Sequence, residues 1–312
     1  MASATDTLAG ILLLGDMNNA DIDVSDLLDD APVIRAMAAV NSSHGTLHKY
    51  NKRTVAAGTG FRVIGAGQDN AAGSIEQVTE TLKLLDATVR RDVGAAKGFS
   101  GGEAAYMASE ARWALRAAFA AAESQLINGT GDQADGFNGL ADHLYTDESD
   151  STTDMVVDAG GAAGSNNVWL IRTTPDDVAL VSNGEIDVGD MAQVAIYDGS
   201  ATYPGLQLPI LSWLALQVGS IRTVARIFNL DGTSTNTLTD DMLSEAISKF
   251  PAGKGPNMII ANRTTLQELQ ASRTATNPTG QPAPFPDQAF GVPIILTDNM
   301  DTTNTLITTT TV

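Results

Sequence analysis

The feature that most constrains the fold is an alanine-rich segment at residues 102–127. Alanine favours helix more strongly than any other residue. Ser100 and Glu103 have the spacing of a capping box that opens a helix, and Asn128 with Gly129 forms a natural stop. A helix of about 25 residues is about 37 Å long, which is unusual in a globular protein of ordinary size. The sequence therefore predicts a helix that serves as a strut.

A stripe along this helix predicts which side is buried. The stripe consists of Tyr106, Trp113, Ala117 and Ala120. We expect Trp113 to lie between the helix and a sheet of the same domain. The competing interpretation places the indole at a subunit interface, because aromatic residues also anchor interfaces.

Residues 46–92 predict a long β-hairpin. The first strand is expected at Val55 to Ile64, although Gly58 and Gly60 interrupt it, and the second at Ile75 to Leu85. Glu80 disturbs the apolar face of the second strand. Glycine, asparagine and aspartate between the strands predict a turn. A two-stranded ribbon is marginal alone in water, so it should lie against another subunit or the body of the protein.

Residues 1–45 predict an arm that has too few apolar side chains to be a domain. A short helix is expected between residues 23 and 40, with Pro32 in its first turn or at a break between two helices. The apolar run from Leu8 to Leu14 is too short to span a bilayer, and no basic region precedes it. We therefore expect a soluble protein without an ordinary signal peptide and without a membrane partner.

The remaining chain alternates short strands and helices, so the predicted fold class is α+β. Helices are expected at Asp240 to Phe250, with the start near Thr239, and at Thr264 to Ser272. Strands are expected at Val168 to Arg172, Val178 to Ser182, Ala192 to Tyr197, Leu206 to Val218, Val224 to Asn229, Met258 to Ala261, Val292 to Thr297 and Leu306 to Val312.

Composition excludes several function classes. Among 312 residues there is no cysteine, which removes disulfides, thiolate zinc sites and cysteine nucleophiles together. The formal net charge is −19, with only 18 Lys and Arg, so nucleic-acid binding is not expected as the main task. The excess of aspartate indicates a solvated acidic surface, or alternatively adaptation to a salty setting.

Motifs for catalysis or phosphate binding are incomplete. His44 and His48 are four residues apart, but the glutamate of a zinc-protease helix is missing between them. His143 has no G-x-S-x-G nucleophile elbow to serve. Gly253 and Lys254 lack the other residues of a P-loop. We therefore assign no catalytic or cofactor-binding residue and predict that the protein is not an enzyme.

Among metal ions, calcium fits the sequence best. Carboxylate oxygens are its preferred ligands, and two groups of aspartates are close in sequence, but neither matches an EF-hand. Acidic solvated loops explain both groups better, so no metal site is assigned. The groups are Asp147, Asp150 and Asp154, and Asp298 with Asp301.

Three strings resemble tailed-bacteriophage major capsid proteins of the Hong Kong 97-type fold, in particular the podovirus-like family. The first is SEARWALRAAFAAAESQLINGTGDQADGFNGLADHL at 109–144, where a long helix, a Gly/Asn loop and the GFNGL segment at 136–140 follow one another. The second is NNVWLIRTTPDDVALVSNGEIDVGD with VGSIRTVARIFNLDG, in which Arg226, Asn229 and Leu230 fit an R-x-x-N-hydrophobic strand. The third is NMIIANRTTLQELQASR with FGVPIILTDNMDTTNT.

This resemblance, from about residue 25 to the end, implies a domain division. Residues 1–45 would be the N-arm and residues 46–92 the extended E-loop hairpin. Residues 93–144 and 246–312 would form the peripheral P-domain, with the spine helix at 102–127, and residues 145–245 the axial A-domain. Some relatives join an E-loop lysine to a neighbouring subunit. Lys49, Lys52 and Lys83 are candidates here, but no partner motif can be matched and no such site is assigned.

By resemblance, the protein is a major capsid protein that assembles into an icosahedral shell around viral double-stranded DNA. Its expected partners are itself in hexamers and pentamers, a portal, and either a separate scaffolding protein or none, with assembly in the host cytoplasm and residence in the virion. DNA would be enclosed without sequence-specific binding. The alternatives are an encapsulin-like nanocompartment shell, an acidic surface-layer protein and an unrecognised hydrolase. The lack of complete catalytic motifs disfavours the hydrolase.

Overall fold

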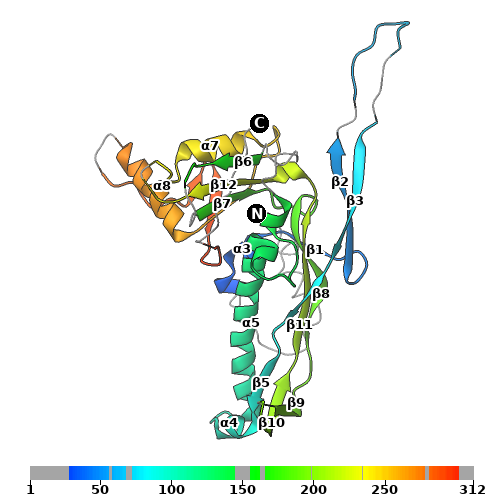
Figure 1. Ribbon diagram of the computed structural model, residues 1–312, viewed down its shortest axis with the longest axis vertical. Helices are drawn as coiled ribbons and strands as arrows, with labels where there is room; N and C mark the ends of the chain where they lie inside the picture. Colours follow the sequence, from blue (N-terminus) through cyan, green and yellow to red (C-terminus); the bar gives the residue numbers. More distant parts are fainter. Residues whose placement is uncertain are drawn as a thin grey trace.

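The computed structural model describes residues 28–55, 58–67, 72–144, 155–161, 166–197, 199–233, 235–277 and 281–301. The molecule is elongated (Figure 1). A six-stranded sheet with two helices forms one end, a long helix with long strands beside it extends from this end, and a hairpin projects away from the body. The predicted terminal strand at Leu306 to Val312 lies outside the described residues.

Helix α5 (Gly102–Asn128) confirms the predicted long helix. Its end is also as predicted, because Gly129 takes a φ of 65°, which favours glycine. The predicted capping box is wrong. Gly102 has a φ of 82°, so the chain turns between Ser100 and the first helical turn, and the N-cap is Gly101 with no side-chain cap.

Two sheets run along the side of α5 (Figure 1). The four-stranded sheet has the order β1 (Ala39–Asn41), β8 (Val178–Val188), β11 (Ile210–Val218) and β4 (Lys83–Asp86). The three-stranded sheet has the order β5 (Val89–Asp92), β10 (Thr202–Leu208) and β9 (Ala192–Tyr197), and helix α4 (Val93–Gly98) follows β5. The predicted strand at Leu206 to Val218 is thus two strands in different sheets, separated at Pro209, which has no N–H for a ladder.

The six-stranded sheet is buried along its central strands. Its order is β14 (Gln288–Ala289), β15 (Val292–Leu296), β13 (Met258–Ala261), β7 (Asn166–Ile171), β12 (Val224–Leu230) and β6 (Val156–Asp158). Every residue of β7, β12 and β13 is buried, since helices α7 (Asp240–Ser248) and α8 (Arg263–Ala275) pack on the sheet. Side chains of Thr239 and Asn262 cap these helices, so both predicted helices are confirmed.

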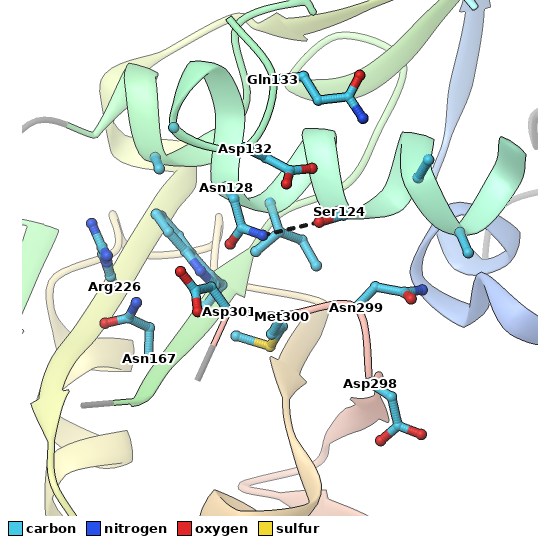
Figure 2. Close-up of a pocket in the computed structure, with 16 residues that line it drawn as sticks. Ser124, Asn128, Asp132, Gln133, Asn167, Arg226, Asp298, Asn299, Met300 and Asp301 are labelled. Atoms are coloured by element: carbon cyan, nitrogen blue, oxygen red, sulfur yellow. Dashed lines mark hydrogen bonds between the residues drawn. The ribbon is translucent and has the colours of Figure 1, made fainter. Parts of the chain in front are cut away.

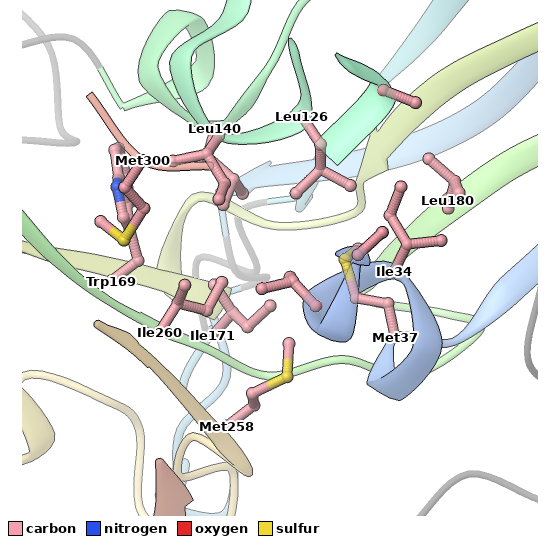
Figure 3. Packing of buried hydrophobic residues seen from close by; sticks show 14 of the residues in the cluster. Ile34, Met37, Leu126, Leu140, Trp169, Ile171, Leu180, Met258, Ile260 and Met300 are labelled. Carbon is pink, nitrogen blue, oxygen red and sulfur yellow. The ribbon is translucent and has the colours of Figure 1, made fainter. Parts of the chain in front are cut away.

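The core joins segments that are distant in sequence (Figure 3). Ile34 and Met37 of the N-terminal segment, Leu126 of α5, and Trp169 and Met258 of the six-stranded sheet all belong to one buried cluster. The N-terminal elements are a 3-10 turn (Leu28–Asp30) and helix α3 (Pro32–Ala36), with Pro32 at the first helical position. The predicted short helix is therefore present, and it is embedded in the subunit's own core.

The hairpin consists of β2 (Leu47–Val55) and β3 (Ser74–Thr81) in antiparallel register. The first strand was predicted eight residues too late, because Val55 to Ile64 is more apolar than the polar, alternating segment that actually pairs. In the described residues after β2, 58–67 form no strand.

Strand pairing brings together parts of the chain that are distant in sequence. Strands β8, β10 and β11 lie in the sheets beside α5, whereas β13 pairs with β7 in the six-stranded sheet and β15 pairs with β13.

Candidate assembly surfaces

The base of the hairpin attaches to the body through polar side chains. His48 is 7% exposed, and its Nε2 lies 2.7 Å from Oε1 of Gln217 on β11. The backbone N–H of Val218 donates to the Tyr50 hydroxyl at 3.5 Å, and burial raises the pKa of Tyr50 to about 12. These contacts fix the base by hydrogen bonds, which require accurate alignment, rather than by apolar contact.

Charged groups surround the same junction. Burial raises the pKa of Glu80, while Lys52 and a hydrogen bond from Asn138 oppose the shift. Burial and the nearby charge of Lys52 lower the pKa of His143 to about 4, and Nε2 of His143 has no hydrogen-bond partner among the described residues. Glu80 therefore disturbs the apolar pattern of β3 because that position faces a polar junction.

The tip of the hairpin has the opposite character. Phe61 and Ile64 are fully exposed, Val63 is 77% exposed and Ile75 is 61% exposed. Sequence reasoning missed this surface because it placed these residues in a strand. The apolar FRVI string between Gly60 and Gly65 was the signal that could have found it. Clustered exposed apolar side chains mark interaction sites.

A buried carboxylate holds the N-terminal segment to the body. Glu123 of α5 is fully buried, and its Oε2 accepts hydrogen bonds from the backbone N–H groups of Val33 (2.7 Å) and Ile34 (3.2 Å). Its Oε1 accepts from the Thr297 hydroxyl and from Nδ2 of Asn299. Burial raises the pKa of Glu123, and these four donors oppose the shift. One side chain thus ties together three segments of the chain.

Trp113 is not in the core. Its side chain is 66% exposed, so its predicted placement between the helix and the sheet is wrong. The face of α5 that is buried consists of Met107, Ala111, Leu115, Phe119, Ala122 and Leu126. Because alanine occurs all around this helix, the alanine stripe through Trp113 did not distinguish the buried face. The guanidinium of Arg116 lies 5.7 Å from the Trp113 ring centroid.

A polar hollow of about 760 Å³ lies between α5 and the six-stranded sheet (Figure 2). Ser124 and Asn128 of α5 line one side, and Nδ2 of Asn128 donates to Oγ of Ser124 at 3.2 Å. Arg226 lines another side, 4.7 Å from the ring of Trp169, and burial lowers its pKa to about 10. Acidic and amide side chains complete the lining, so the hollow has no uniform charge.

Few of the residues considered from sequence come together. His44 lies next to Ser43 while His48 bonds Gln217, and the described residues hold no cluster of three or more metal-ligating side chains. Asp298 pairs with Arg263 at 2.8 Å, and Asp301 lines the hollow. Asp147, Asp150 and Asp154 lie outside the described residues. Lys49 and Lys52 lie on β2 and Lys83 begins β4, away from the hairpin tip.

Among the helices of the described residues, none combines the length and the apolar character needed to cross a bilayer. The fold thus combines a long helix, the long strands beside it, a separate six-stranded sheet and a projecting hairpin. The family model of the major capsid protein GP7 matches residues 16–303. The chain belongs to this family of major capsid proteins.

Several solved structures that resemble this capsid protein come from phages. A structure of bacteriophage epsilon15 is 18% identical with a TM-score of 0.61, covering 91% of this chain and 90% of that one. The bacteriophage JBD30 capsid is 14% identical with a TM-score of 0.50, covering 92% and 97%. A JBD30 capsid decorated with minor capsid protein trimers is 12% identical with a TM-score of 0.51, covering 84% and 88%. Among curated proteins, none matches this sequence significantly.

These likenesses confirm the predicted fold, which is the Hong Kong 97-type capsid fold. The family match makes this capsid protein a structural, shell-forming component of the virion, as predicted. Its exposed hairpin tip is a surface that an assembly of copies can bury.

Proposed function

We propose that the protein assembles as hexamers and pentamers into an icosahedral shell around viral double-stranded DNA. The observation that carries the proposal is the apolar hairpin tip, where Phe61 and Ile64 are fully exposed on a hairpin that projects from the body. Such side chains are expected to be covered in the working state, and a neighbouring copy is the natural cover in a homo-oligomer.

We keep residues 1–45 as the arm and 46–92 as the E-loop, whose last strands, β4 and β5, pair into the sheets beside α5. We revise the other boundaries from the strand pairing. The peripheral domain would be α5 with the sheets that contain β8, β11 and β10, and the axial domain would be the six-stranded sheet with α7 and α8. A portal, a separate scaffolding protein and assembly in the host cytoplasm belong to this proposal.

Contact with DNA would be non-specific in this account. The formal net charge of −19 opposes binding to phosphates, so the subunit would enclose the genome without binding it tightly.

Negative-stain microscopy of the expressed protein tests the proposal. We expect closed shells, and particles from infected cells should protect double-stranded DNA from nuclease. A compact monomer at all salt and protein concentrations would contradict shell formation. Shells that enclose a host enzyme instead of DNA would favour a nanocompartment.

A further inference from the structure

The exposed face of α5 around Trp113 has the character of a docking surface. Trp113 is 66% exposed, and Ala117, one turn further along, is exposed too. Large exposed aromatic side chains commonly anchor interfaces. The guanidinium of Arg116 lies 5.7 Å from the indole ring centroid, and exposed Arg112 precedes Trp113 in the sequence, so the face combines an apolar centre with basic side chains.

The N-terminal segment of the same chain begins next to this face. Nε of Arg116 lies 2.8 Å from Oδ2 of Asp30, two residues after the start of the described part at Leu28. The 14 residues from Leu14 to Leu28 can extend over about 46–50 Å. Helix α5 is about 40 Å long, so the preceding residues can reach any point along it.

The chemistry of that segment complements the face. Residues 8–14 read LAGILLL, an apolar run that needs cover from water. Residues 1–27 contain five aspartates and no lysine, arginine or glutamate. An acidic segment with an apolar centre matches a face with Trp113 at its centre and two basic side chains.

We propose that residues 8–14 dock on the exposed face of α5 of the same subunit, over Trp113 and Ala117, with the neighbouring aspartates facing Arg112 and Arg116. The family model begins at residue 16, so this contact involves residues outside the matched region. It concerns what covers the long helix, and it does not depend on shell formation.

Cross-linking of paired cysteines tests the docking, and the absence of native cysteine makes the chain suitable. Leu12→Cys is combined with Ala117→Cys, and the full chain is treated with a short bismaleimide. The control combines Leu12→Cys with Thr264→Cys, an exposed position on α8. We expect an intrachain link that forms about tenfold faster in the first pair, because docking raises the effective concentration. Equal rates, or no link, would overturn the proposal.

Two further measurements make the result unambiguous. A link that appears only between chains, as a dimer on a denaturing gel, would assign the face to a neighbouring subunit and overturn docking in the same subunit. Deletion of residues 2–15 should raise acrylamide quenching of Trp113 fluorescence, and Trp113→Phe should abolish the difference. Sedimentation of the same samples reports shells independently, so shells without cross-links refute the docking alone.

Discussion

The hairpin and the body of the subunit distribute apolar side chains in opposite ways. In the body, Trp169, Leu126 and Met258 are buried in one continuous cluster. In the hairpin, Phe61 and Ile64 are exposed at the tip, while His48 and Tyr50 make the contacts with the body. The comparison indicates that the body is stabilised by its own core, whereas the apolar hairpin tip has no cover within the described part of the subunit and is the surface that the proposed assembly would bury.

Truncation of a core aromatic residue should have the largest effect on the body. Trp169 is 1% exposed, so we expect Trp169→Ala to lower the free energy of unfolding by about 3–5 kcal/mol. Urea denaturation followed by circular dichroism measures this change. An unchanged midpoint would contradict the placement of Trp169 in the core.

Removal of the buried carboxylate should have the next largest effect. In Glu123→Ala the donors at Val33, Ile34 and Asn299 lose their acceptor, which we expect to cost about 2–3 kcal/mol. Limited proteolysis should then cut the N-terminal segment before the rest of the chain. Ser109→Ala, an exposed position on the same helix, is the control and should leave both readouts unchanged. Equal behaviour of the two variants would refute the role of Glu123.

The hairpin junction should weaken in acid. The pKa of His143 in the folded state is about 4, below the usual value of 6.5, so the unfolded chain binds more protons between these values. The contribution of neutral His143 to the free energy of unfolding is therefore fully present above about pH 6.5 and is lost as the pH falls toward 4. Since His143 is partly exposed, we expect the free energy of unfolding to fall by about 1–3 kcal/mol between pH 6.5 and pH 4.

A matched pair of variants isolates this effect. His143→Gln should flatten the decline of thermal stability between pH 6.5 and pH 4, while His44→Gln, at an exposed histidine, should retain it. The same decline in both variants would show that other groups cause the acid sensitivity.

Trp113→Ala should have the smallest effect on stability. Because the indole is 66% exposed and lies outside the core, we expect a change of no more than about 0.5 kcal/mol in the free energy of unfolding of the chain that lacks residues 2–15, in which the proposed docking is absent. Circular dichroism and limited proteolysis check this, with Trp169→Ala as the contrast. An insoluble or protease-sensitive Trp113→Ala chain would restore the core placement that the sequence predicted.

Elements with strong local signals could be predicted from the sequence. Alanine content and Gly129 located helix α5, Thr239 located the start of α7, and β9 has the predicted bounds. The surfaces were harder to predict, because they depend on which side of an element the rest of the chain covers. Alanine on every side of α5 concealed its buried face, and the polar partner of Glu80 is Asn138, 58 residues away in sequence.

Buried polar contacts were the least predictable part. The acceptor role of Glu123 joins segments around residues 33, 123 and 297, and nothing local to any one of them specifies the other two. The hairpin tip, by contrast, carried a readable FRVI string that the strand pattern obscured.

The most direct test of the account is a double substitution at the hairpin tip, Phe61→Ser with Ile64→Ser. Arg62→Ser, at an exposed polar position between them, is the matched control. Sedimentation velocity and negative-stain microscopy are compared with thermal unfolding. We expect the double variant to unfold at the wild-type temperature but to form no shells, while Arg62→Ser assembles normally. Normal shells from the double variant would contradict assembly through the hairpin tip.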